Sequence, residues 1–233
     1  VSGSRERDEL AHDASGSAGT RGLTCETQDR TRWNPFRASI VDCCDVGFSF
    51  QGVRNGMFRR WRRVDQPGLE LARIAIEKHG VTVASTLVDG GDEPFSLRYI
   101  WTLDSSWRTR GLRIEHMDGD DHWLTIERTG PASWRVDNRP APHLDGCDEL
   151  DLSATPFCNA LAIRRLGGDG ELTAAYINAS EMSVEPSRQR YERIDARNWR
   201  YTDLGVAHGF TAALQLDRDG LIEHYEGLFE ALN

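Results

Sequence analysis

Apolar and polar residues alternate along most of the chain after residue 56, and this period of two is the feature that most limits its fold. Between Phe95 and Leu103 every second residue is large and apolar, and most residues between them are polar. Side chains of a β-strand point alternately to opposite faces of a sheet, so this segment predicts a strand with one buried face. Residues 81–88, 108–114 and 124–128 continue the pattern and predict further strands.

Turn-forming residues separate the predicted strands at short intervals: Asp89-Gly90-Gly91, Asp118–Asp121, Asp137–Pro140 and Asp217–Gly220. Short strands joined by such turns are typical of an antiparallel meander and not of βαβ units. Two segments predict short helices. Phe157–Leu166 follows Thr155-Pro156, which would place a proline at the first helical position, and Leu221–Leu232 could form a second helix.

The chain divides into a polar head and a patterned body. Residues 1–56 are rich in Ser, Gly, Asp and Arg and show no apolar period, so we expect a disordered N-terminal extension. The sequence begins with Val, and Met57 stands directly before the patterned body, so we expect Met57 to be the true or an alternative start; a genuine flexible tail is the alternative. No repeat or linker interrupts residues 57–233, which predicts one mainly β domain.

Composition excludes several classes of function. The chain has 28 Lys and Arg against 37 Asp and Glu, and an acidic body does not supply the basic field that nucleic-acid binding needs. The five cysteines lack metal-finger and CxxC spacing, so we expect reduced thiols, although Cys147 and Cys158 could pair if the fold brought them together. No apolar run approaches about 18 residues and no leader precedes the body, which predicts a cytoplasmic protein without stable membrane insertion.

No metal, cofactor, nucleotide or nucleophile signature is present, and Asp217–Gly220, which begins like a calcium loop, lacks that loop's later ligands. Four segments carry a family resemblance instead: FRRWRRVDQPGLELARI (58–74), SSWRTRGLRI (105–114), DELDLSATPFCNALAIRRL (148–166) and EPSRQRYERID (185–195). The chain resembles the putative glycolipid-binding family of bacterial proteins, whose fold is likened to lipoprotein carriers. The resemblance implies a single strongly curved, rolled antiparallel sheet, open and barrel-like, with one or two short helices.

Two groups of residues are candidates for a ligand site. Trp107 would begin a strand, offering an aromatic face and an N–H donor, and Arg108 and Arg110 would lie on the opposite face beside Leu112 and Ile114. Such arginines suit the polar head of an amphipathic ligand, and they equally suit a surface ion-pair ladder.

The second group lies around the predicted helix at Phe157. Thr155 is a natural N-cap, Arg164 could reach Asp151 or Glu149, and this corner is either an ion-paired structural element or the polar end of a ligand pocket. Further members of the same group are Asn159, Arg190 and Tyr191.

The leading functional hypothesis is a non-catalytic protein that binds a glycolipid or another amphipathic small molecule in the concavity of the rolled sheet. An enzyme acting on a small metabolite through Asp151 and Arg164 is one alternative, and would require a carboxylate with a raised pKa in a dry pocket. A β-scaffold that binds a partner or forms a homodimer is the other, and would show an exposed apolar patch without a cavity. The lining of the concavity distinguishes them.

Overall fold

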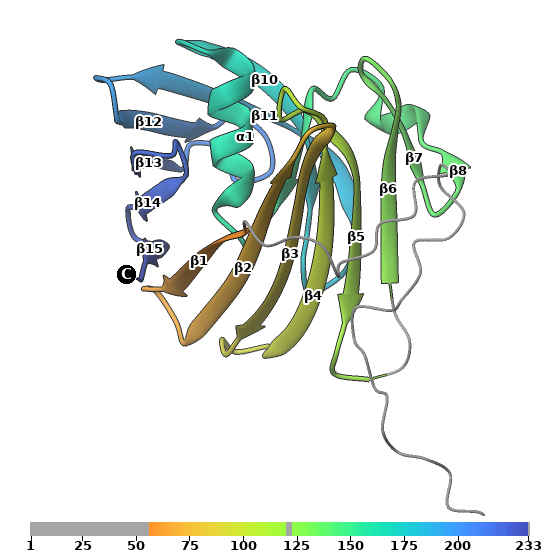
Figure 1. Cartoon of the computed structure of the whole chain (residues 1–233), viewed down its shortest axis with the longest axis horizontal. Helices are drawn as coiled ribbons and strands as arrows, with labels where there is room; N and C mark the ends of the chain where they lie inside the picture. The colour runs from red at the N-terminus through yellow and green to blue at the C-terminus, as the bar shows by residue number, and fades with distance from the viewer. Residues whose placement is uncertain (1–55, 120–122, 233) are drawn as a thin grey trace, which may run out of the picture. The chain divides into compact units, whose positions relative to one another are not determined.

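The computed structural model describes residues 56–119 and 123–232, which form one rolled β-sheet curled around one α-helix (Figure 1). Residues 1–55, the region of the expected disordered extension, lie outside the described residues. The strands are β1 (Gly56–Arg63), β2 (Gly68–Glu77), β3 (Gly80–Asp89), β4 (Phe95–Leu103), β5 (Thr109–His116), β6 (Trp123–Gly130), β7 (Ser133–Val136), β8 (Arg139–Pro140), β9 (Glu149–Leu152), β10 (Gly170–Ile177), β11 (Val184–Arg193), β12 (Asn198–Asp203), β13 (Thr211–Leu216), β14 (Ile222–Tyr225) and β15 (Phe229–Ala231).

The strand order confirms the predicted meander. Neighbours in sequence are neighbours in the sheet from β8 back to β1 and from β15 back to β9, and β1 pairs with β15 to join the two halves. All pairs are antiparallel except β9 with β10. The sheet stays open between its edge strands β8 and β9, which a segment containing the 3-10 helix η2 (Pro142–Leu144) connects. The fold is therefore mainly β, with one large, strongly curved sheet.

The helix α1 (Phe157–Leu166) spans the predicted segment, but Pro156 is its N-cap residue and not its first helical residue, so Thr155 stands one position before the cap. The hydroxyl of Thr155 accepts a hydrogen bond from the Phe157 N–H at 3.2 Å, which satisfies one of the amides left open at a helix start. At the other end Gly167 has φ +68° and donates its N–H to Ile163 O at 2.9 Å, a left-handed cap that glycine adopts without strain.

The predicted second helix at Leu221–Leu232 is wrong. This segment forms β14 and β15 around a turn in which Gly227 has φ +74°. Pairing of Trp61 with Ala231 gives the last strand its place next to β1. A short segment with a weak local preference thus takes the conformation that completes a sheet.

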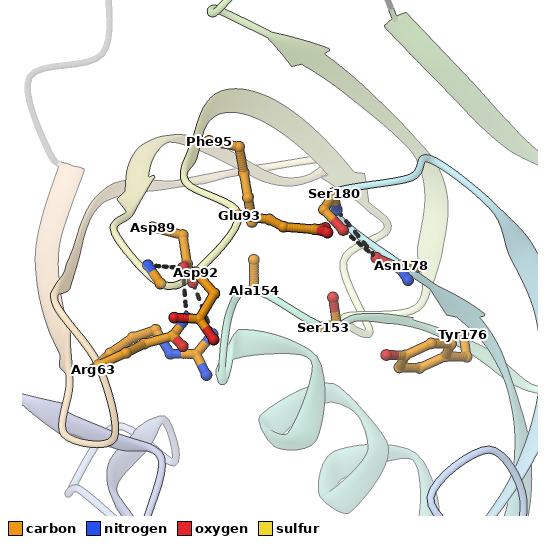
Figure 2. Close-up of a pocket in the computed structure, with 12 residues that line it drawn as sticks. Arg63, Asp89, Asp92, Glu93, Phe95, Ser153, Ala154, Tyr176, Asn178 and Ser180 are labelled. Atoms are coloured by element: carbon orange, nitrogen blue, oxygen red, sulfur yellow. Dashed lines mark hydrogen bonds and ion pairs between the residues drawn. The ribbon is translucent and has the colours of Figure 1, made fainter.

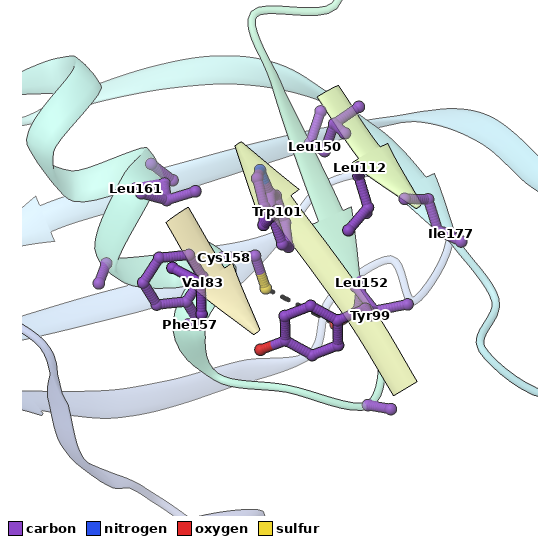
Figure 3. Close-up of a cluster of buried hydrophobic side chains, with 14 of the residues drawn as sticks. Val83, Tyr99, Trp101, Leu112, Leu150, Leu152, Phe157, Cys158, Leu161 and Ile177 are labelled. Atoms are coloured by element: carbon purple, nitrogen blue, oxygen red, sulfur yellow. Dashed lines mark hydrogen bonds between the residues drawn. The ribbon is translucent and has the colours of Figure 1, made fainter. Parts of the chain in front are cut away.

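The interior of the roll is filled by α1 and by the side chains around it. Seven consecutive residues of the helix, 157–163, are buried, as expected of a helix enclosed on all sides. Phe157 packs edge-on against Trp101, with ring centroids 5.6 Å apart. The ring of Tyr99 also packs edge-on against Trp101, with ring centroids 6.1 Å apart (Figure 3). The helix contacts β9, β10 and β14. The hollow in which a ligand was expected is the hydrophobic core of the protein.

A bulge at the start of β5 overturns the predicted arrangement of its arginines. Thr102 pairs with Gly111 but Leu103 pairs with Thr109, so Arg110 is an extra residue that points outward. Arg108 and Arg110 therefore do not share a face with Leu112 and Ile114, which are buried. Trp107 precedes the strand in a turn at φ +64° instead of beginning the strand.

The filled interior predicts the effect of shortening Leu161, whose side chain is only 1% exposed. Leu161→Ala should lower the free energy of unfolding by about 2–5 kcal/mol, because it removes buried methyl groups and leaves a cavity. Leu71→Ala, on a side chain 48% exposed on the outer face, is the matched control and should change it by less than about 0.5 kcal/mol. Urea denaturation measures both, and equal effects would contradict a packed interior.

Candidate functional site

A pocket of about 380 Å³ opens at one end of the roll, where the N-terminal side of α1 approaches the ends of several strands (Figure 2). Its walls come from the β1–β2 turn, the β3–β4 turn and the segments that follow β9 and β10. The lining residues are Arg63, Gln66, Asp89, Gly91, Asp92, Glu93, Phe95, Ser153, Ala154, Tyr176, Asn178 and Ser180.

A bonded cluster around Arg63 fixes one wall of the pocket. The guanidinium of Arg63 contacts Asp89 at 2.8 Å and Asp65 at 2.6 Å, and the carboxylate of Asp89 also accepts hydrogen bonds from Gln66 at 2.5 Å and from the Gly91 N–H at 3.1 Å. Both acids bind the same arginine, so its charge is already balanced. Arg63 is therefore a poor receptor for an anionic ligand.

Two carboxylates of the β3–β4 turn complete this side of the pocket. Asp92 and Glu93 are exposed and form no hydrogen bond or ion pair with another described residue. Figure 2 shows the Glu93 side chain reaching toward Ser180 and Asn178 across the pocket. With Asp89 already paired to Arg63, these two free acids make the pocket electronegative and leave hydrogen-bond acceptors for a ligand.

The opposite wall follows β9 and β10. The amide oxygen of Asn178 accepts hydrogen bonds from the Ser180 N–H at 3.1 Å and its hydroxyl at 3.0 Å, and Ser153 Oγ accepts one from the Ala179 N–H at 3.0 Å. These bonds hold the Asn178–Ser180 turn and leave the Asn178 amide N–H₂ group available. Tyr176 adds a half-buried aromatic face and hydroxyl.

A narrow crevice of about 10 Å³ leads inward from the same region to Glu70, sharing Arg63, Asp89 and Ala154 with the pocket. One oxygen of Glu70 accepts hydrogen bonds from Tyr99 at 2.6 Å and Ser85 at 2.7 Å, and the other is buried without a partner among the described residues. Burial raises the pKa of Glu70 above its ordinary value. The crevice has room for about one water or hydroxyl group.

Behind the pocket, a chain of hydrogen bonds joins three of the predicted site residues. Asn159 donates to the Tyr191 hydroxyl at 3.1 Å, which in turn donates to Gln189 at 3.1 Å, and Gln189 donates to Asp151 at 2.5 Å. Cys158 donates its thiol to the other oxygen of Asp151 at 2.9 Å. Asp151 stands beside Tyr176 in the sheet, so the network braces the pocket wall from the inside.

Burial raises the pKa of Asp151 and, much further, those of Cys158 and Tyr191, which favours their neutral forms. Burial likewise raises the pKa of Cys147 to about 11. Both thiols are free and buried, so neither has the thiolate character of a reactive cysteine.

The other predicted site residues lie elsewhere. The Thr155 hydroxyl binds the first N–H of α1. The guanidinium of Arg164 lies 4.4 Å from the Trp107 ring centroid and donates to the Asp219 carbonyl, so it meets neither Asp151 nor Glu149. Arg108 donates to the Pro131 carbonyl, Arg110 is exposed and Arg190 pairs with Glu171 on the surface.

The pocket residues themselves escaped prediction. The sequence marks only Asp89-Gly90-Gly91 as a turn and does not single out Asp92, Glu93, Asn178 or Ser180. Ser153 lies inside the family-like segment 148–166, but nothing in its pattern marks it as a site residue. The pocket forms where turns far apart in sequence meet at one end of the roll, and no local pattern marks such a place. Among the described residues, no three His, Cys, Asp or Glu side chains are grouped as metal ligands.

Comparison with known proteins identifies the family. A family model described as "Putative glycolipid-binding" matches residues 58–231. The chain belongs to this family. Its fold matches the crystal structure of a DUF1089 family protein from Pseudomonas aeruginosa at 30% sequence identity and a TM-score of 0.62, over 74% of this chain and 95% of that one. No curated protein matches the sequence. No helix among the described residues of this family member is long and apolar enough to cross a membrane.

The environment of Glu70 predicts a pH-dependent effect of Glu70→Gln. A carboxyl group whose pKa is raised in the folded state stabilises the fold below its unfolded pKa of about 4.3, and that contribution is lost as the pH rises through the folded pKa. The glutamine variant does not ionise. Between pH 4.5 and 8 the unfolding free energy of the variant should therefore rise relative to that of the parent, by about 1.4 kcal/mol for each unit by which the pKa of Glu70 is raised.

Glu171→Gln is the matched control for this experiment. Hydrogen bonds from Arg190 and Arg188 lower the pKa of Glu171, so this variant should lose stability relative to the parent as the pH rises. Urea denaturation at several pH values measures both differences. A difference between Glu70→Gln and the parent that stays constant with pH would contradict a raised pKa of Glu70.

Proposed function

We propose that this protein binds the polar head group of a glycolipid in the pocket at the end of the roll and leaves most of the acyl chain outside the core. The observation that carries the proposal is a pocket with unused hydrogen-bonding groups beside a fully packed interior. Asp92 and Glu93 have no partners among the described residues, whereas Leu161 and Phe157 fill the space that a lipid tail would need.

The charge of the pocket favours a neutral, hydroxyl-rich head group. Sugar hydroxyls donate hydrogen bonds, and the carboxylates of Asp92 and Glu93 accept them. A phosphate would meet these two acids and an arginine that Asp65 and Asp89 already neutralise, so repulsion and the lack of a free cation oppose it. The pocket volume of about 380 Å³ lies within the usual range for small-molecule sites, which is roughly 300–1,000 Å³.

The tail contributes less than it would in an enclosed cavity. Ten fully buried methylenes contribute about 8 kcal/mol, against an association cost of about 4–15 kcal/mol. A tail lying on the surface buries only part of its area, so contacts with the head group have to supply a large share of the affinity. Exposed apolar side chains near the pocket, Val64, Leu69 and Val88, offer a partial surface for the first methylenes.

A binding measurement with a defined glycolipid tests this function. Delipidated protein should bind dodecyl maltoside, used below its micelle concentration, at least about tenfold more tightly than dodecyl phosphate, because the pocket accepts hydroxyl donors and repels anions. Isothermal titration and native mass spectrometry measure the two affinities. Tighter binding of the phosphate, or no binding of the maltoside, would contradict the proposal.

Neutralising the free acids locates the site. The double variant Asp92→Asn/Glu93→Gln should weaken maltoside binding by about tenfold or more, because hydrogen bonds to charged acceptors are worth roughly 1.5–3 kcal/mol each. The matched control Glu77→Gln/Asp145→Asn neutralises two exposed acids outside the pocket and should leave the affinity unchanged. Equal affinities of both double variants would place the ligand elsewhere.

A further inference from the structure

We propose that the outer face of β1 and β2 docks onto the surface of a bilayer that contains anionic lipids. The docking surface, which we call the arginine–apolar patch, consists of three cross-strand pairs, each an apolar side chain opposite an arginine: Phe58 with Arg73, Leu71 with Arg60, and Leu69 with Arg62. This goes beyond the proposed function, since binding a glycolipid head group in the end pocket does not require a membrane-facing surface.

The alternation of strand side chains produces the patch. Trp61 and Glu70 point into the core, so the residues on either side of them point outward. The apolar members are unusually exposed for their size: Phe58 is 55% exposed, Leu69 51% and Leu71 48%. Large apolar side chains gathered on one exposed face indicate an interaction surface, because isolated proteins seldom leave such side chains together in water.

The patch is cationic on an acidic protein. The whole chain has a formal charge of −9, yet the three pairs contain three arginines and no acid. Val88 extends the apolar part onto β3, where it pairs with Leu69 and is 55% exposed. Glu230, on the neighbouring strand β15, lies opposite Arg62 and forms an ion pair with it at 2.5 Å, so the patch and this partner hold three arginines against one acid. Glu77 stands further away, at the end of β2. Charge is thus separated between this face and the electronegative end pocket.

Interleaved arginines and apolar side chains match the interface of a bilayer. Arginine keeps its guanidinium at the level of the phosphates while its aliphatic part and neighbouring leucines enter the apolar region. A second copy of the chain fits less well, because a twofold contact would gather the arginines of both copies in one interface with only Glu230 of each copy beside them. A nucleic acid would use the arginines and leave the apolar half of each pair exposed to water.

The position of the patch links it to the end pocket. Leu69 and Val88 line the small crevice that shares Arg63, Asp89 and Ala154 with the pocket. Docking through the patch therefore places the mouth of the pocket beside the head-group layer, where a glycolipid presents its sugar. The contact is peripheral, since the structure contributes side chains and no membrane-crossing helix among its described residues.

Vesicle co-sedimentation of the full 233-residue chain tests this inference. Vesicles of phosphatidylcholine with roughly a third phosphatidylglycerol, free of glycolipid, should bind the protein about tenfold or more tightly than phosphatidylcholine alone. Arg60→Glu/Arg62→Glu should remove that preference. The matched reversal Arg188→Glu/Arg190→Glu, at exposed arginines of β11 that pair with Glu171, should retain it.

A second pair of substitutions separates a bilayer from other anionic partners. Leu69→Ser/Leu71→Ser preserves every charge and should weaken vesicle binding several-fold, because fewer apolar groups enter the membrane. Circular dichroism and thermal unfolding establish that each variant is folded. Three results would each overturn the inference: binding without a preference for anionic vesicles, equal losses in both arginine reversals, or no loss on replacing the leucines. If replacing the leucines causes no loss, the surface is purely electrostatic and suits a soluble polyanion instead.

The same assay keeps this inference separate from the head-group proposal. Asp92→Asn/Glu93→Gln should bind glycolipid-free anionic vesicles at least as tightly as the parent, because these acids are not part of the patch and their loss can only lessen repulsion from the anionic head groups. If the protein does not bind maltoside, the docking of the patch onto anionic vesicles is unaffected. If it does not bind vesicles, the proposal that the pocket binds a glycolipid head group is unaffected.

Discussion

Packing of α1 against the inner face of the sheet is the contact on which the rest of the structure depends. The helix supplies Phe157 and Leu161 to a core whose opposite wall contains Trp101, and these side chains are almost fully buried. A sheet curled this strongly would otherwise enclose an open apolar hollow, which is unstable in water without a ligand or a filling element. Because the protein's own helix fills that space, the site that we propose for the ligand lies at the end of the roll, where the segment before the helix meets the turns between strands.

The helix also explains why polar groups accumulate near its N-terminal end. Asp151 on β9 and Glu70 on β2 lie near this end, whereas Glu149 lies at the opposite end of β9, and burial raises the pKa of each. Arg128 lies 3.6 Å from Glu149, whereas Glu70 and Asp151 have only neutral hydrogen-bond donors around them among the described residues. Such groups stabilise one arrangement of the core only while they are satisfied, which makes the helix start the most exacting part of the fold. The exposed acids of the pocket, Asp92 and Glu93, lie just outside this region.

Much of the fold can be predicted from the sequence because its signals are local. The period of two between Phe95 and Leu103 yields β4 with the expected buried face, and Thr155 followed by proline marks the start of α1. Local signals fail where pairing with a distant segment decides the outcome. The last strand depends on β1 rather than on its own preferences, and the bulge at Arg110 turns Thr109 into the core, where it accepts a hydrogen bond from Trp101. The site is the extreme case: Asp92, Ser153 and Asn178 come from three turns, and only the rolled arrangement of the sheet brings them together.

The central claim is that the ligand occupies the end of the roll and that α1 stays in place when it binds. A crystal structure of the complex with dodecyl maltoside tests this most directly. The account predicts sugar density between Asp92, Glu93 and Asn178, with Phe157 and Leu161 packed as in the free protein. Density for the alkyl chain inside the roll, with α1 displaced from Trp101, would contradict it.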